Sequence, residues 1–199
     1  VESYAQSVVD SYGARKVYCE AYLAATHKSE RFPYTAIRLP SVVGAAADWR
    51  HSKLQAWIDK GNPIDPAGGK GTQFRVIYSG DVATAVLAVL RRKEETLGLA
   101  INFAQAERPT LAEYLQCCAR AMDKKPVRAG FFSYSQSLPD AEPLCNYENQ
   151  GVLDTSLAQK LLAWEPTPMK TWMEETVEWH KNGFPGGDLA IGGIDNIRS

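Results

Sequence analysis

Tyr12 and Lys16 stand four residues apart in the segment "SYGARKVYCEAYL" (11–23), which has the composition of a helix. Residues i and i+4 share one face of a helix, so a phenol and an ammonium group would meet in the same space. A free phenol has a pKa of about 10, and a nearby cation favours its ionised form. Such a tyrosine can exchange a proton with a hydroxyl or carbonyl group of a substrate near neutral pH.

The same spacing also fits a surface helix without chemistry, in which Lys16 pairs with Glu20. The nine tyrosines of this chain are numerous enough that roughly half a Y-x-x-x-K match is expected by chance. The spacing alone therefore leaves both interpretations open.

Strands alternate with helices along the chain, which is typical of an α/β protein. Alanine-rich, periodic sequence predicts a helix over 2–27, and the β-prone run 34–39 ends at Pro40. A further helix is expected at 52–61, followed by a loop that contains "PAGGKGTQ".

The second half of the chain contains three helix-start signals. The segment "QFRVIYSGDVATAVLAVLRR" predicts a strand that passes directly into a helix, with Asp81 as the N-cap. After the strand "LAINFA", Thr110 and Glu113 have the spacing of a capping box. In the last helix, Thr167 is the expected N-cap and Pro168 the expected first residue. The tryptophans Trp164, Trp172 and Trp179 are expected to pack this helix onto the body.

The charge balance and the cysteines indicate which classes of protein the sequence supports. Twenty-two basic and 23 acidic side chains give a net charge of −1, so binding to nucleic acid is not supported. No apolar run approaches the roughly 20 residues of a membrane span. Four cysteines without a C-x-x-C pair favour a reduced, cytoplasmic protein, or an organelle if an upstream targeting segment has been lost. The three histidines lie far apart in sequence, so no metal site is expected.

Five segments, in order, resemble the extended short-chain dehydrogenase/reductases, the NAD-dependent epimerase/dehydratase family. "SYGARKVYCEAYL" is similar to that family's "YGxSKxxxExxl" helix and "IRLPSVVG" to its "lRpxnvyGp" segment. "QFRVIYSGDVATAVLAVL" resembles "rdfihVdDvarAi", and "LGLAINFAQAERPTLAEYLQ" resembles "GevyNigsgeptTlrEla". "LDTSLAQKLLAWEPTPMKTWMEETVEWHKN" resembles "ldtskakrlLGwePrtsleegLretvew". Together these segments span nearly the whole chain.

The resemblance implies an α/β protein that is the C-terminal portion of a Rossmann-like NAD(P)-binding fold plus a smaller α/β substrate domain. Tyr12 then matches the family's acid/base, and Lys16 matches the lysine that binds the nicotinamide ribose. The loop of Pro40, Ser41, Val42 and Val43 matches the segment near the nicotinamide and the substrate. Ligands commonly sit at such a loop, at the carboxyl end of a strand.

The resemblance also divides the chain. Residues 1–45 are expected to end the Rossmann-like domain, and strand 98–104 to return to its sheet. Residues 46–97 and 105–185 are assigned mainly to the substrate domain, and the glycine-rich tail 186–199 is expected to be loose.

Neither glycine fingerprint of a dinucleotide site, G-x-G-x-x-G or G-x-x-G-x-x-G, occurs after a strand anywhere in the chain. "PAGGKGTQ" matches neither and is interpreted as an ordinary loop. We therefore expect the chain to be the C-terminal part of a longer protein, or to pair with a partner chain that supplies the first half. A homo-oligomer is also expected.

The expected function is that of an NAD- or NADP-dependent oxidoreductase or epimerase/dehydratase. The substrate is a small molecule: a sugar, a nucleotide sugar, or another carbonyl compound or polyol. In nucleotide-sugar members an asparagine and an arginine hold the nucleotide, and here Ser41 and Phe74 stand at those positions, with Arg75 one residue away. Ser41 and Arg75 are the candidate substrate contacts. The alternative is a family member without catalysis that serves as a scaffold or an RNA- or complex-binding subunit.

Overall fold

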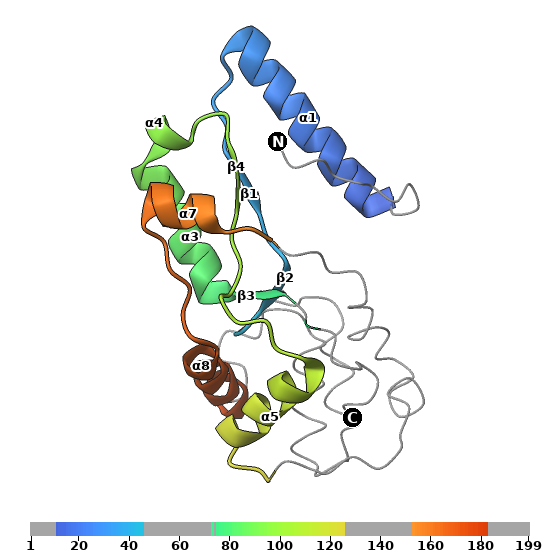
Figure 1. The fold of residues 1–199 in the computed structure, drawn as a ribbon, viewed down its shortest axis with the longest axis vertical. Coiled ribbons are helices and arrows are strands. Elements are labelled where there is room, and N and C mark those ends of the chain that lie inside the picture. The colour runs from blue at the N-terminus through green and yellow to red at the C-terminus, as the bar shows by residue number, and fades with distance from the viewer. Residues whose placement is uncertain (1–10, 46–72, 74, 126–152, 183–199) are drawn as a thin grey trace.

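The computed structural model describes residues 11–45, 73, 75–125 and 153–182 of the 199-residue chain. Within these ranges, two pairs of parallel strands are combined with helices that precede and follow them along the chain (Figure 1). This confirms the α/β class predicted from the sequence. The predicted helix at 52–61, most of the glycine-rich loop and the tail 186–199 lie outside the described residues.

Two pairs of short parallel strands form the described sheets. Strand β1 (Ala36–Arg38) pairs with β4 (Ala100–Asn102), and strand β2 (Ser41–Val43) pairs with β3 (Val76–Tyr78). The predicted strand at 34–39 is thus confirmed. Its pairing with β4 continues past the strand ends, where Phe103 donates to the Arg38 carbonyl at 3.0 Å.

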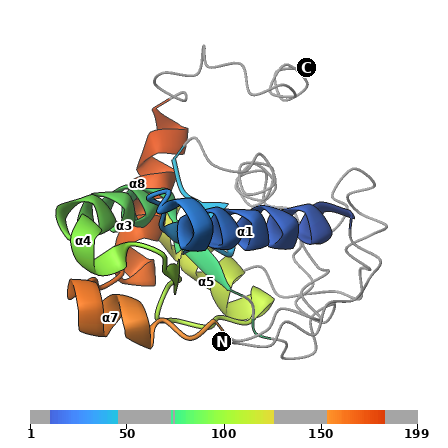
Figure 2. The ribbon, with the colours of Figure 1, turned by 90° about the horizontal axis from the view of Figure 1, so that it is seen from above.

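Helix α1 (Ser11–Glu30) contains Tyr12 and Lys16. It continues past the predicted end at His27, and it stops where Arg31 takes a left-handed backbone with φ of 60°. A left-handed residue after the last turn ends helical hydrogen bonding, and Pro33 lacks the amide hydrogen that a further turn would use. Figure 1 shows α1 standing apart from the other helices beside the β1–β4 pair, and in Figure 2, seen from above, α1 lies across the view in front of them.

Helix α3 (Ser79–Arg91) follows β3 without a connecting loop, as the sequence predicts. The prediction that Asp81 caps it is wrong. The N-cap position is occupied by Tyr78, whose side chain makes no capping hydrogen bond, and Asp81 lies in the first helical turn. The short helix α4 (Lys93–Thr96) continues the chain towards β4.

The Asp81 carboxylate instead joins three segments of the chain. It is 2% exposed and accepts hydrogen bonds from the hydroxyl and amide of Thr167 at 2.7 and 2.9 Å. Gln105, just after β4, donates to it at 2.8 Å and also donates to the Thr167 carbonyl at 3.0 Å. A buried carboxylate needs such partners because its water is lost on folding. Asp81 therefore ties α3, the exit of β4 and the approach to the last helix together.

Three further helices complete the described part: α5 (Leu111–Ala121), α7 (Ser156–Leu162) and α8 (Met169–Lys181). The capping box of Thr110 and Glu113 is confirmed, and hydrogen bonds from Thr110 lower the pKa of the Glu113 carboxyl. The predicted start of the last helix is one residue too early, because Pro168 is the N-cap and Thr167 binds Asp81.

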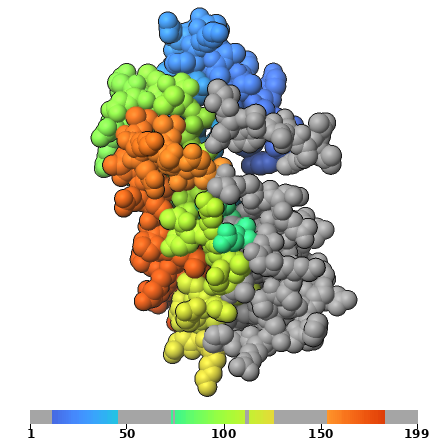
Figure 3. Space-filling view, viewed as in Figure 1, coloured from blue at the N-terminus to red at the C-terminus, as the bar shows by residue number. Residues whose placement is uncertain are grey.

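The β2–β3 ribbon separates two apolar cores. Successive side chains of a strand point to opposite faces, so Val76 enters one core and Ile77 the other. The first core contains α5 and α8, including Trp172, and the second contains α3, α7 and β4, including Trp164. Trp172 therefore packs the last helix as predicted, whereas Trp164 packs edge-on against Phe103 in the second core. In the space-filling view, α1 and the α5–α8 pair stand at opposite ends of the described part (Figure 3).

Gly44, directly after β2, is expected to tolerate no side chain. Its φ is 116°, and an added Cβ would lie 2.6 Å from the Tyr78 ring and 2.8 Å from the Ser79 hydroxyl. Gly44→Ala should therefore lower the free energy of unfolding by about 1–3 kcal/mol, measured by urea denaturation. In a Tyr78→Ala background the clash with the ring disappears, while the contact with the Ser79 hydroxyl and the positive φ remain, so the same substitution should cost less. An equal cost in both backgrounds would contradict the contact.

Tyr78 is expected to make the folded protein less stable at alkaline pH. Its hydroxyl donates to the Glu175 carboxylate at 2.6 Å, and burial together with this bond raises the pKa of Tyr78 from 10.0 to about 12. A pKa raised by folding adds stability that is complete below pH 10 and is lost as the pH rises through about 12. The unfolding free energy should thus fall more across this window in the wild type than in Tyr78→Phe. Parallel curves for the two proteins would contradict the expectation.

Candidate functional site

Tyr12 and Lys16 lie together on the first turns of α1. The Lys16 ammonium is 5.3 Å from the centroid of the Tyr12 ring, within the range of a cation–π contact. Tyr12 is 62% exposed, so its phenol is accessible to a molecule from outside. The structure thus brings the two residues together as their spacing predicts, while their chemical roles remain predictions.

A cleft of about 970 Å³ runs between α1 and the β1–β4 pair. Tyr12 and Lys16 line it from the helix, and Arg38 and Asn102 line it from the strand ends. Asn102 is 7% exposed and donates through Nδ2 to the Asp154 carbonyl at 3.0 Å. Among the described residues, its Oδ1 has no hydrogen-bond partner. Apolar side chains also line the cleft, among them Val17, Leu99 and Leu157. A mainly apolar lining with a few polar groups is the usual character of a small-molecule site.

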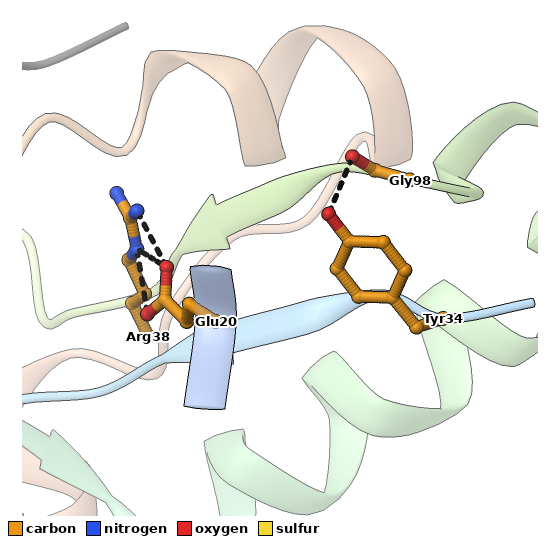
Figure 4. Close-up of polar contacts among 4 residues, drawn as sticks. All are labelled: Glu20, Tyr34, Arg38 and Gly98. Carbon is orange, nitrogen blue, oxygen red and sulfur yellow. Dashed lines mark hydrogen bonds and ion pairs between the residues drawn. The ribbon is translucent and has the colours of Figure 1, made fainter. Parts of the chain in front are cut away.

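An ion pair between Glu20 and Arg38 crosses this cleft. Arg38 Nε donates to both carboxylate oxygens at 3.0 and 3.1 Å, and Nη2 donates at 2.7 Å. Figure 4 shows the two side chains pointing at each other from α1 and β1. Both side chains are partly buried, which limits screening by water. The four-residue spacing suggested Glu20 as a surface partner of Lys16, and its pairing with Arg38 was not predicted. The usable signal was a charged residue between Ile37 and Leu39 in a predicted strand.

The C-terminal end of α1 has its own anchor. His27 Nδ1 donates to the Phe32 carbonyl at 2.7 Å, and its ring packs edge-on against Tyr34. The Tyr34 hydroxyl donates to the Gly98 carbonyl at 3.1 Å, as Figure 4 also shows. This end of the helix is thereby tied to the turn that leads into β4.

The prediction that Pro40 to Val43 form a loop is wrong, because Ser41–Val43 are strand β2, paired with β3, and Pro40 directly precedes it. Ser41 stands opposite Val76 in the strand register, and Val43 is fully buried in the α5–α8 core. Pro40, Ser41, Val42 and Val43 do not line the cleft beside Tyr12. A ligand contact by this segment therefore stays a prediction.

Arg75, the second candidate substrate contact, lies directly before β3. It is 6% exposed, and its Nη1 donates to the Gln105 carbonyl at 3.4 Å. Burial lowers the pKa of this guanidinium, and the positive charge of Arg108 lowers it further. Arg75 does not line the cleft beside Tyr12, and its substrate contact also stays a prediction.

A second cleft, of about 870 Å³, lies between α5 and α8. Cys117 lines it, but burial raises the pKa of this thiol. The thiolate is the nucleophilic form of cysteine, so a raised pKa argues against nucleophilic catalysis here. The first cleft, with its phenol and ammonium, is the better candidate for chemistry.

The described residues contain neither a membrane-spanning helix nor a cluster of metal ligands. In those residues no helix is long and apolar enough to cross a bilayer. The same ranges hold no group of three or more histidine, cysteine, aspartate or glutamate side chains suited to a metal ion.

Solved structures of similar fold span nearly the whole chain. UDP-glucuronic acid 4-epimerase from Bacillus cereus, in complex with UDP-glucuronic acid and NAD, is 22% identical with a TM-score of 0.68. The Bordetella bronchiseptica enzyme WbmF, in complex with NAD⁺ and UDP, is 18% identical with a TM-score of 0.67. UDP-glucose 4-epimerase from Thermotoga maritima, with UDP-glucose, is 19% identical with a TM-score of 0.64.

Each alignment covers most of this chain but a smaller share of the solved protein. The alignments cover 92%, 94% and 86% of this chain, but 58%, 57% and 53% of the Bacillus, Bordetella and Thermotoga proteins. The chain thus spans little more than half the length of these structures. The likeness confirms the predicted fold, the C-terminal portion of a Rossmann-like α/β protein.

The amino-acid sequence was also compared with curated proteins and with models of protein families. A search of curated proteins found no match. The family model described as "NAD dependent epimerase/dehydratase family" matches residues 3–103, just over half of the chain, and this range includes Tyr12, Lys16, Glu20 and Arg38. The chain therefore belongs to the NAD-dependent epimerase/dehydratase family.

Proposed function

We propose that this chain supplies the proton-transfer end of an NAD-dependent epimerase, dehydratase or oxidoreductase. Tyr12 acts as the acid/base on a substrate hydroxyl or carbonyl, and Lys16 holds the nicotinamide ribose beside it. The observation that carries the proposal is the Tyr12–Lys16 pair on the face of α1 that borders the cleft. Family membership and the likeness in fold to nucleotide-sugar epimerases support it.

The residues of the cleft suit one end of the cofactor. The Lys16 ammonium has three donors for ribose hydroxyls, and the Tyr12 phenol can give or take one proton. NAD, when bound, takes up a hydride and returns it. The chain's own part is to place the phenol at the substrate oxygen and to move the proton there. NAD is favoured over NADP because the Bacillus and Bordetella structures contain NAD.

The pyrophosphate end of NAD needs a second element. It is normally met by backbone amides at a glycine-rich turn and by a helix N-terminus. Since the fingerprint of that turn does not occur in the 199 residues, we propose that a glycine-rich half acts together with this chain. This half either precedes it in a longer protein or comes from a partner. The protein that contains both halves is called the complete enzyme below.

The proposed substrate carries a hydroxyl or carbonyl group that the hydride and the proton can reach. Nucleotide sugars are the first class, because the solved structures of similar fold include epimerases of UDP-glucose and UDP-glucuronic acid. Ser41 stands where nucleotide-sugar members have an asparagine, so a free sugar, another polyol or a carbonyl compound is the second class.

The test is a panel of substrates with the complete enzyme and NAD. UDP-sugars are paired with the corresponding free sugars, and the readouts are the absorbance of reduced nicotinamide and the appearance of the epimer. We expect turnover with at least one member of the panel, and the ratio within each pair identifies the substrate class. A protein that binds NAD but turns over no member would contradict the enzymatic proposal and favour the scaffold role.

A further inference from the structure

The Glu20–Arg38 ion pair joins the proposed catalytic helix to the sheet at a well-defined point. Tyr12, Lys16 and Glu20 follow one another at intervals of four residues, so they occupy one side of α1. Arg38 is the last residue of β1, whose register with β4 pairs Arg38 with Asn102. The pair therefore links the helix face that holds the candidate acid/base to a strand fixed by a hydrogen-bonded ladder.

The geometry of the pair restricts how α1 can move. Three hydrogen bonds of 2.7 to 3.1 Å use two guanidinium nitrogens and both carboxylate oxygens. Such a fork has a preferred direction, unlike the point charge of a lysine. Rotation of α1 about its axis, or sliding along β1, would break at least one of the bonds.

The location of the pair matters because the other described anchor is distant from Tyr12. Glu20 is two turns of helix from Tyr12, which is about 12 Å at 1.5 Å per residue. The His27–Tyr34 anchor is about 22 Å away on the same scale. A small rotation at the far end of the helix would displace the phenol much more than the anchor itself.

We propose that Glu20 and Arg38 are positioning residues, which set the rotation and height of α1 and thereby place Tyr12 and Lys16 at the cofactor and substrate. This inference rests on the proposed function. The pair acts through the helix, and its effect is on the rate of proton transfer more than on substrate affinity. Misplacement of a reacting group by about 1 Å can lower a rate by about a hundredfold.

The experiment uses Arg38→Lys and Glu20→Gln in the complete enzyme. Arg38→Lys keeps the positive charge and removes the fork. The matched control is Arg92→Lys, because Arg92 forms an exposed ion pair with Glu95 at 3.1 Å, away from the cleft. Loss of the two-nitrogen contact should lower kcat by about tenfold to a hundredfold, while KM for the substrate should change less than about twofold. The control should keep wild-type kcat and KM, and all melting temperatures should be similar.

A second readout does not depend on turnover. The rate at which an amine-specific reagent acylates Lys16, measured by mass spectrometry, is compared with that of Lys28 on the same helix. We expect Arg38→Lys and Glu20→Gln to change the rate at Lys16 and to leave Lys28 unchanged. Unchanged rates at both lysines, or a kcat equal to that of the control, would overturn the positioning role.

The two readouts also separate this inference from the proposed function. Where Tyr12→Phe retains full turnover, the proposed function fails, and the Lys16 acylation rates alone decide whether the pair positions the helix.

Discussion

Tyr12→Phe in the complete enzyme is expected to lower kcat by about 10²- to 10⁴-fold, the usual contribution of a positioned acid/base. The substitution removes only the hydroxyl, from a side chain that is 62% exposed. The fold should therefore be unaffected, and the melting temperature should equal that of the wild type. Steady-state kinetics and thermal denaturation measure the two quantities.

Tyr22→Phe is the matched control for this prediction. Tyr22 is on the same helix and is also 62% exposed, but it does not line the cleft. It should keep the wild-type kcat and the wild-type melting temperature. Equal kcat values for Tyr12→Phe and Tyr22→Phe would contradict the assignment of Tyr12.

Asp81→Ala should destabilise the fold without involving the proposed chemistry. The substitution removes the Asp81 carboxylate, which is 2% exposed, and the amide and hydroxyl of Thr167 lose this hydrogen-bond acceptor. Buried donors that lose their partner cost about 1–3 kcal/mol each, so the total loss for these two should be about 2–6 kcal/mol. For a chain of this size, that lowers the melting temperature by roughly 4–24 °C.

The control for Asp81→Ala is Glu94→Ala, at an exposed position on α4. Exposed substitutions of this kind usually stay within about 0.5 kcal/mol of the wild type. A loss for Asp81→Ala as small as that of Glu94→Ala would contradict the three-segment network. A large loss of kcat with unchanged melting would instead place Asp81 in the active site.

Features that depend on neighbours in sequence could be predicted from the sequence. The Tyr12–Lys16 contact needs only the four-residue spacing of a helix, and the Thr110–Glu113 capping box needs only three residues. The direct passage from β3 into α3 is similarly local, because a β-prone run is followed at once by helical spacing.

Features that join distant segments could not be predicted from the sequence. Local sequence made Asp81 look like a helix cap, but its partner Thr167 is 86 residues away. The same holds for Glu20 and Arg38, which are 18 residues apart and meet only because α1 folds back along β1. In both cases the partner of a charged side chain depends on how distant helices and strands pack together. The helix or strand propensity of a single residue carries no information about that packing.

Titration of NAD by calorimetry into this chain alone, and into the chain together with the proposed glycine-rich half, tests the central claim most directly. The chain alone offers Tyr12 and Lys16 to the nicotinamide end, but no glycine fingerprint for the pyrophosphate. We expect no micromolar binding by the chain alone, and binding at about micromolar Kd when both halves are present. Micromolar binding by the chain alone, or none by the two halves together, would contradict the account.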